Sequence, residues 1–138
     1  MSHPDGLPDL FLDRSLGRIR VASLLRVEGL RLTTLAEHYG IPADEDVIDV
    51  QWLALAGQQG WAVFMKDARI RYNRAERETV KEYRVRCFCM SNRNLTGDEM
   101  AQRYIANLHS ITSACAEPGP FIYAVHKNRI ERLPIGQD

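Results

Sequence analysis

Two aspartates in this sequence each stand at the end of a short apolar run. Asp13 directly follows Leu10-Phe11-Leu12, and Asp67 follows the run 61–65 after one lysine. Short apolar runs bounded by glycine or charge are typical of strands buried on both faces of a parallel sheet. Ligands and catalytic groups gather at the carboxyl ends of such strands. If the two strands are neighbours, we expect both carboxylates to lie side by side.

A third aspartate, Asp49, lies on the apolar face of a helix that the spacing predicts over 44–58. A lone carboxylate on a buried face is costly unless a cation, a metal or hydrogen-bond donors compensate it. Asp46, near the edge of the same face, is a reserve candidate. Three neighbouring carboxylates stay ionised only around a hard cation such as Mg²⁺ or Mn²⁺. Such a site can activate water to hydrolyse a phosphodiester.

Each aspartate also has a purely structural explanation. Strand-end aspartates commonly cap the helix that follows, and Asp13 precedes Ser15, itself a plausible cap for a helix over 16–28. Their joint placement, rather than any single position, favours a site.

The charges are balanced overall but unevenly distributed. The net charge is zero, and 15 of the 18 basic residues are arginine. Eight basic residues fall within 66–86, whereas 37–49 holds five acids and no lysine or arginine. A basic strip beside an acidic pocket suits a site that handles phosphodiesters. Two ordinary solvated faces explain the same pattern.

Length and cysteine usage bound the class of protein. A chain of 138 residues is one domain by size, here 9–138 after a flexible N-terminus at 1–8 with two prolines and a glycine. The start lacks the pattern of a signal peptide, so we expect a cytoplasmic protein with no membrane span. Cys87, Cys89 and Cys115 predict buried reduced thiols, with a Cys-x-Cys metal site as the alternative.

The remaining elements alternate between strand and helix. A Thr96-x-x-Glu99 capping box predicts a long helix over 96–116. The other predicted helices cover 74–83 and a short turn to Tyr39; the other strands cover 30–34, 84–90, 121–125 and 129–133, the last two as a hairpin. This order predicts an α/β fold with a mainly parallel sheet and helices on both faces.

Four segments, 11–16, 24–29, 49–56 and 63–67, resemble a PIN-like domain and, more narrowly, the VapC-type ribonuclease toxins of bacterial toxin–antitoxin pairs. The resemblance implies a three-layer α/β/α PIN-like fold, an acidic pocket that binds Mg²⁺ or Mn²⁺, and endoribonuclease activity that leaves a 5′-phosphate and a 3′-hydroxyl. By motif position, Asp13, Asp49 and Asp67 would be its catalytic and metal-binding acids. A cognate antitoxin that blocks the pocket, and often a homodimer, are implied too.

The basic residues nearest these acids are candidates to hold RNA phosphates: Arg14, Lys66, Arg69 and Arg71. Two positions depart from the family pattern. Met65 stands where many PIN domains have threonine or serine, and the fourth acid has only Asn73, Glu76 or Glu78 nearby. A catalytically silent PIN-like module that binds RNA or protein is therefore the main alternative. A receiver-like phosphoacceptor domain is a further one, although Asp13 is followed by Arg14 and Ser15 rather than by a second acid.

Overall fold

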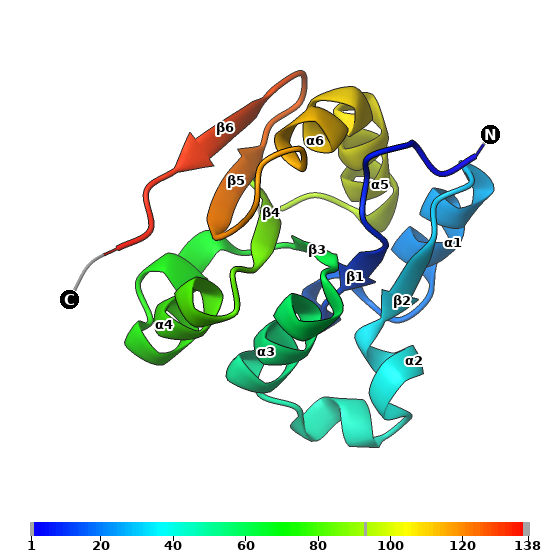
Figure 1. Ribbon diagram of the computed structural model, residues 1–138. Coiled ribbons are helices and arrows are strands. Elements are labelled where there is room, and N and C mark those ends of the chain that lie inside the picture. The colour runs from blue at the N-terminus through cyan, green and yellow to red at the C-terminus, as the bar shows by residue number, and fades with distance from the viewer. Residues whose placement is uncertain (1, 93, 137–138) are drawn as a thin grey trace.

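The computed structural model describes residues 2–92 and 94–136. Within them the strands form one six-stranded sheet in the order β2-β1-β3-β4-β5-β6 (Figure 1). The strands are β1 (Leu10–Leu12), β2 (Leu32–Thr34), β3 (Ala62–Met65), β4 (Arg86–Met90), β5 (Phe121–Val125) and β6 (Ile130–Leu133). All neighbours pair in parallel except the β5–β6 hairpin, which is antiparallel. The strands that precede Asp13 and Asp67 are neighbours, as predicted, with Leu12 opposite Phe64.

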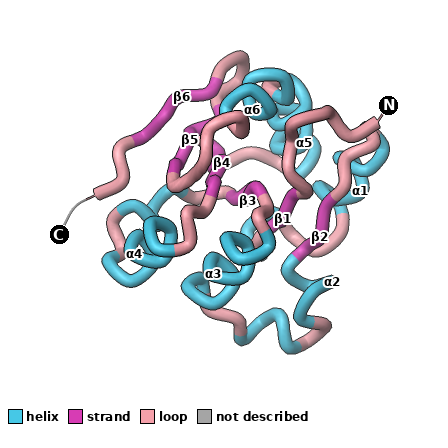
Figure 2. The backbone as a smooth tube through the Cα atoms, viewed as in Figure 1, coloured by secondary structure: helices cyan, strands magenta, loops and turns pink. Residues whose placement is uncertain are grey.

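Helices cover both faces of this sheet, which confirms the predicted three-layer α/β/α fold (Figure 2). One face carries α1 (Arg20–Val27), α5 (Gly97–Ala106) and α6 (Leu108–Ala114), and the other carries α2 (Leu35–Tyr39), α3 (Asp49–Gln59) and α4 (Arg74–Glu82). Successive strand side chains point to opposite faces. Leu10 and Leu12 therefore join the first layer's core, and Phe11 joins the second.

Three predicted helices differ from the observed ones. The helix predicted over 16–28 begins only at Arg20, because Gly17 takes a positive φ of 83° and ends the 3-10 turn η1 (Arg14–Leu16). The helix predicted over 44–58 is divided into the 3-10 turn η2 (Ala43–Asp46) and α3, with Val47 and Ile48 extended between them. Residues next to these two breaks, in η1 and at the start of α3, line the cleft described below.

The helix predicted over 96–116 is also divided. Asn107 ends α5, and its side-chain amide donates to the carbonyl oxygens of Arg103 at 2.9 Å and His126 at 2.8 Å. The capping box of Thr96 and Glu99 is present as predicted. Side-chain hydrogen bonds from asparagine to backbone carbonyls favour non-helical backbone at the asparagine, which explains the break at Asn107.

In the segment before β1, His3 contacts the rest of the domain. The His3 ring is buried: its Nε2 lies 2.9 Å from the Leu7 carbonyl oxygen, and its Nδ1 accepts from the Arg31 amide at 2.9 Å. The three cysteines are buried free thiols, as predicted. Across the described residues, every helix is too short or too polar to span a lipid bilayer.

Candidate active site

A cleft of about 760 Å³ opens at the carboxyl ends of β1 and β3. It brings together the three predicted aspartates, Asp13, Asp49 and Asp67. The predicted phosphate-binding residues Arg14, Lys66 and Arg69 also line it. The rest of its described lining is Ser15, Met65, Ile70, Asn73, Glu76 and Asn94. This lining leaves out the predicted residues Asp46 and Arg71.

Asp13 is a buried carboxylate fixed by the turn that it begins. It is the N-cap of η1: the Ser15 amide donates to its Oδ1 at 3.1 Å, and the Ser15 hydroxyl donates to the same oxygen. Its own amide donates to the Phe64 carbonyl oxygen at 3.3 Å, which continues the β1–β3 ladder by one residue. Burial, reinforced by the nearby charge of Asp49, raises the pKa of Asp13 to about 6.

Asp67 is the matching carboxylate at the end of β3. It caps the 3-10 turn η3 (Ala68–Arg71), because its Oδ1 accepts from the Arg69 amide at 2.9 Å. Its Oδ2 accepts from Arg69 Nε at 2.5 Å. The capping role that sequence reasoning set against a catalytic one is therefore present at both strand ends. Both carboxylates also line the cleft.

Asp49 and Glu76 supply the acids on the helical side of the cleft. Asp49 lies in the first turn of α3, where its Oδ1 accepts from Trp52 Nε1 at 3.0 Å. Glu76 lies in the first turn of α4 and forms a side-chain hydrogen bond with Asp49. Burial and the charge of Asp49 raise the pKa of Glu76 to about 7, so Glu76 is partly protonated near neutral pH.

Sequence reasoning considered Glu76 but found no motif for it. A usable signal was present: Asn73 accepts from the Glu76 amide at 3.0 Å, which is the N-cap contact that an Asn-x-x-Glu spacing predicts. That spacing locates Glu76 in a first helical turn. It does not reveal that this turn faces Asp49 across the cleft, because the contact joins two separate helices.

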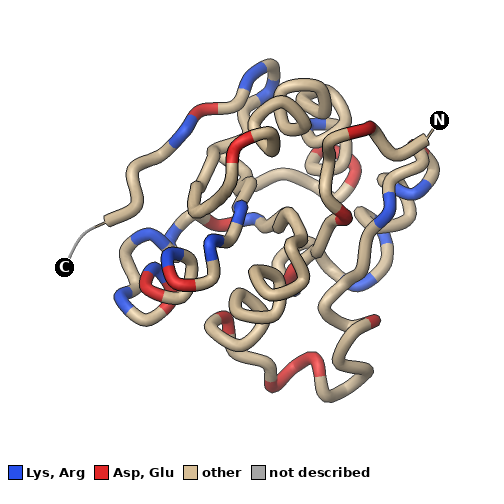
Figure 3. Tube along the Cα trace, viewed as in Figure 1, with Lys and Arg blue, Asp and Glu red and all other residues tan. Residues whose placement is uncertain are grey.

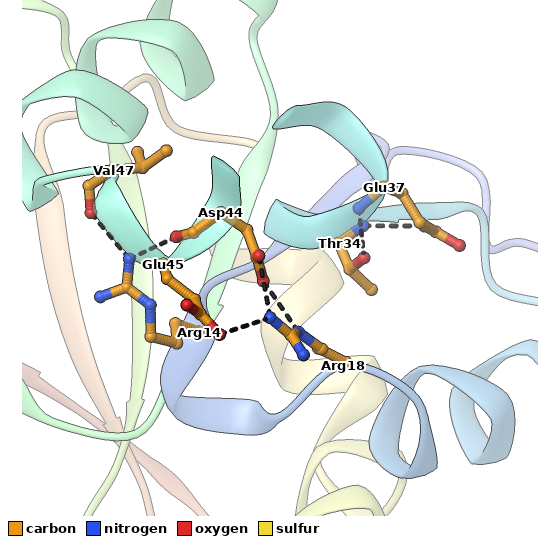
Figure 4. A network of polar contacts seen from close by, with 7 residues as sticks. All are labelled: Arg14, Arg18, Thr34, Glu37, Asp44, Glu45 and Val47. Carbon is orange, nitrogen blue, oxygen red and sulfur yellow. Dashed lines mark hydrogen bonds and ion pairs between the residues drawn. The ribbon is translucent and has the colours of Figure 1, made fainter. Parts of the chain in front are cut away.

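Arg14 lines the cleft but directs part of its guanidinium into the protein. Its Nη2 donates to the carbonyl oxygens of Asp44 at 2.6 Å and Val47 at 2.8 Å (Figure 4). Arg18 lies beside it and pairs with the buried carboxylate of Asp44 at 2.9 Å. This partner lowers the pKa of Asp44, which stays ionised.

The predicted residues outside the cleft have other surroundings. Asp46 is exposed at the end of η2. Arg71 donates from Nη1 to the Pro134 carbonyl oxygen at 3.2 Å and from Nη2 to the Tyr72 hydroxyl at 2.6 Å. Trp52 belongs to the core, as predicted, and its contact with Asp49 adds a role that the sequence did not indicate.

The acidic and basic strips predicted from the sequence lie on different elements (Figure 3). The acids gather on η2, at the bottom of the view, and basic residues follow α4, at its left. Part of the acidic strip is neutralised within the fold, since Arg18 pairs with Asp44 and Arg26 pairs with Glu37 at 2.8 Å. Of the acids in this strip, Asp49 is the one that lines the cleft.

The cleft offers carboxylate oxygens as its charged ligands, together with amide oxygens from Asn73 and Asn94. This donor set fits Mg²⁺ or Mn²⁺ in its chemistry, and the raised pKa of Asp13 marks buried negative charge that a cation would stabilise. In the described part of the chain, no three His, Cys, Asp or Glu side chains yet converge into an ion-holding group. Instead Ser15, Trp52 and Arg69 each donate to one of the three aspartates.

Comparison with known proteins places this cleft in a family. The family of PIN like domains matches residues 8–92, which run from β1 through β4 and include all four acids of the cleft. A protein of Mycobacterium tuberculosis named "Putative ribonuclease VapC45" is 46% identical over 127 residues, which cover 92% of each chain. No solved structure matches the chain. The chain therefore belongs to the PIN-like domain family, and its predicted resemblance to VapC-type proteins is confirmed.

Proposed function

We propose that the protein is a metal-dependent endoribonuclease that acts as the toxin of a type II toxin–antitoxin pair. One observation carries the proposal: Asp13, Asp67, Asp49 and Glu76 line one cleft at the carboxyl ends of adjacent parallel strands. The name of the mycobacterial relative, a ribonuclease of the VapC type, supports the same activity.

In this proposal Asp13, Asp49 and Asp67 hold Mg²⁺ or Mn²⁺, and Glu76, rather than Asp46, is the fourth acid. The cation, when bound, supplies a polarised water and neutralises charge on the phosphate that is attacked. Glu76 lies against Asp49 with a pKa of about 7 and can take up or release a proton near neutral pH. Hydrolysis would leave a 5′-phosphate and a 3′-hydroxyl.

Lys66 and Arg69 are the proposed phosphate contacts at the rim. Both line the cleft, and the exposed Arg69 guanidinium already lies against the carboxylate of Asp67. Lys66 precedes Asp67 in the chain and Arg69 follows it. A phosphate that enters beside Asp67 would therefore meet a positively charged side chain from each of these two residues. Arg71 lies outside the cleft, so in this proposal it would contact a different phosphate, further along the RNA strand.

The proposal also includes the partners of such a toxin. We expect a cognate antitoxin that covers the cleft, RNA as the substrate, and action in the cytoplasm. Self-association into a homodimer belongs to the same expectation. Co-expression with the neighbouring gene product, followed by size-exclusion chromatography with light scattering, measures both assemblies.

A catalytically silent module is the second candidate. Met65 carries no hydroxyl, and the aspartates are each bonded to a protein donor. A silent module would bind RNA without cutting it, with or without a divalent cation.

The test is cleavage of a pool of structured RNAs by the purified chain without antitoxin, in Mn²⁺, in Mg²⁺ and in chelator. Asp67→Asn is assayed beside Arg20→Ala, a control that removes an exposed arginine paired with Asp98, neither of which lines the cleft. We expect metal-dependent cuts with ligatable 5′-phosphates that vanish only in Asp67→Asn. RNA binding without cuts in every metal would replace the nuclease with the silent module.

A further inference from the structure

We propose that Arg14 and Ser15 are positioning residues that set the spacing of the acids in the cleft. They are consecutive in η1, directly after Asp13, and their side chains reach two different elements. Arg14 reaches the segment that presents Asp49, and Ser15 reaches the end of β3 that presents Asp67. The inference rests on the proposed function, because it concerns acids that are there assigned to a cation.

The first contact fixes the start of α3. Arg14 Nη2 bonds the carbonyl oxygens of Asp44 and Val47, and Val47 is two residues before Asp49 (Figure 4). A cation at the last carbonyls of a helical turn is favoured by the turn's dipole as well as by charge-assisted hydrogen bonds. Among the described residues, α3 has no side-chain cap at Ile48 that could fix its start from within.

The second contact fixes the end of β3. The Ser15 Oγ accepts from the Lys66 amide at 2.9 Å and donates to Asp13 Oδ1. It thereby bridges β1 and β3 beyond their last paired residues, Leu12 and Phe64. Lys66 directly precedes Asp67, so one hydroxyl holds the Asp13 carboxylate and the backbone next to the second carboxylate.

Through these two contacts, η1 positions the acids of the cleft. The backbone next to Asp49 and the backbone next to Asp67 are both bonded to η1, the turn after Asp13. Truncating Arg14 should therefore loosen Asp49 relative to the other acids, and truncating Ser15 should loosen Asp67. The cation would then bind more weakly. The Arg14 contacts go to the carbonyl oxygens of Asp44 and Val47, so the loss of Arg14 would leave the rim residues that meet RNA in place. This differs from the prediction that Arg14 holds an RNA phosphate, since a phosphate ligand acts on RNA affinity.

The test is calorimetric titration of the metal-free chain with Mn²⁺, without RNA. Arg14→Ala and Ser15→Ala should each weaken Mn²⁺ binding by about 10- to 100-fold, the range typical of residues that orient metal ligands. Ser15→Thr, which keeps the hydroxyl, should restore it, and Arg20→Ala should bind as the wild type does. In cleavage assays of Arg14→Ala we expect kcat to fall with the RNA KM and its salt dependence unchanged.

The opposite results are distinct. Wild-type Mn²⁺ affinity in Arg14→Ala, with a raised RNA KM and a weaker salt dependence, would make Arg14 a phosphate ligand and overturn its positioning role. Wild-type affinity in Ser15→Ala would overturn the role of Ser15. If circular dichroism shows that Arg14→Ala does not fold, the same measurements of Mn²⁺ affinity and RNA KM are made on Arg14→Lys instead. A folded wild-type chain that binds no Mn²⁺ would overturn the proposed function itself.

Discussion

The cleft joins two pairs of acids that the fold positions in different ways. Asp13 and Asp67 extend from adjacent strands, and each caps the 3-10 turn that follows. Asp49 and Glu76 extend from the first turns of two helices and meet through their side chains. The sheet thus fixes the first pair through its backbone ladder, whereas the second pair depends on individual side-chain contacts. We expect the two pairs to respond differently to substitution.

The largest expected difference is in catalysis. Asp13→Asn should lower kcat on the order of 10²- to 10³-fold, because it removes fixed charge at the reacting phosphate. Glu76→Gln should lower it about 10-fold, the size of an outer partner's effect, because Glu76 is partly protonated near neutral pH. Single-turnover cleavage in saturating Mn²⁺ measures both. Equal losses would show that the pairs do not differ in function.

The next prediction concerns stability and pH. Burial and Asp49 raise the pKa of Asp13 from 3.8 to about 6, so between these values the folded state holds a proton that the unfolded state has lost. Its contribution to the free energy of unfolding therefore falls as pH rises from about 4 to 6 and stays low above that. At pH 7.5 in chelator, Asp13→Asn should be more stable than the wild type by on the order of 1–3 kcal/mol.

Urea denaturation at pH 4 and at pH 7.5 separates this effect from a change in packing. The gain should be much smaller at pH 4, where the folded wild type is protonated at Asp13 and its unfolded state is already partly protonated. Saturating Mn²⁺ should reverse the order at pH 7.5. A gain of the same size at both pH values would assign it to something other than the Asp13 charge.

The smallest expected effect is on the second pair alone. Trp52→Phe removes the indole bond to Asp49 and should cost about 1–2 kcal/mol, with a loss of Mn²⁺ affinity below 10-fold. Tyr104→Phe is the matched control, since the single proton of the buried Tyr104 hydroxyl is within hydrogen-bond reach of the carbonyl oxygens of both Met65 and Phe88. It should cost similar stability and leave Mn²⁺ affinity unchanged, because the ladder still holds the strand ends. A larger loss of affinity in Tyr104→Phe would reverse the comparison.

The same division explains what the sequence could predict. Asp13 and Asp67 could be placed together because parallel strands end at a common edge, and that requires only the order of apolar runs. Glu76 and the target of Arg14 could not, since each depends on a contact between elements far apart in the chain. The helix break at Asn107 escaped for the same reason: its amide bonds the carbonyl oxygen of His126, on another element.

The buried thiols of β4 supply an independent gauge of the sheet. Cys87 and Cys89 lie fully buried in the central sheet, and burial raises the pKa of both thiols well above its usual range. An alkylating reagent needs an accessible thiolate, so the folded chain protects both sulfurs. The rate of their alkylation therefore reports how often the sheet opens enough to expose Cys87 and Cys89 to solvent. It can be followed by mass spectrometry in the presence of RNA, metal or antitoxin without introducing a cysteine by mutation.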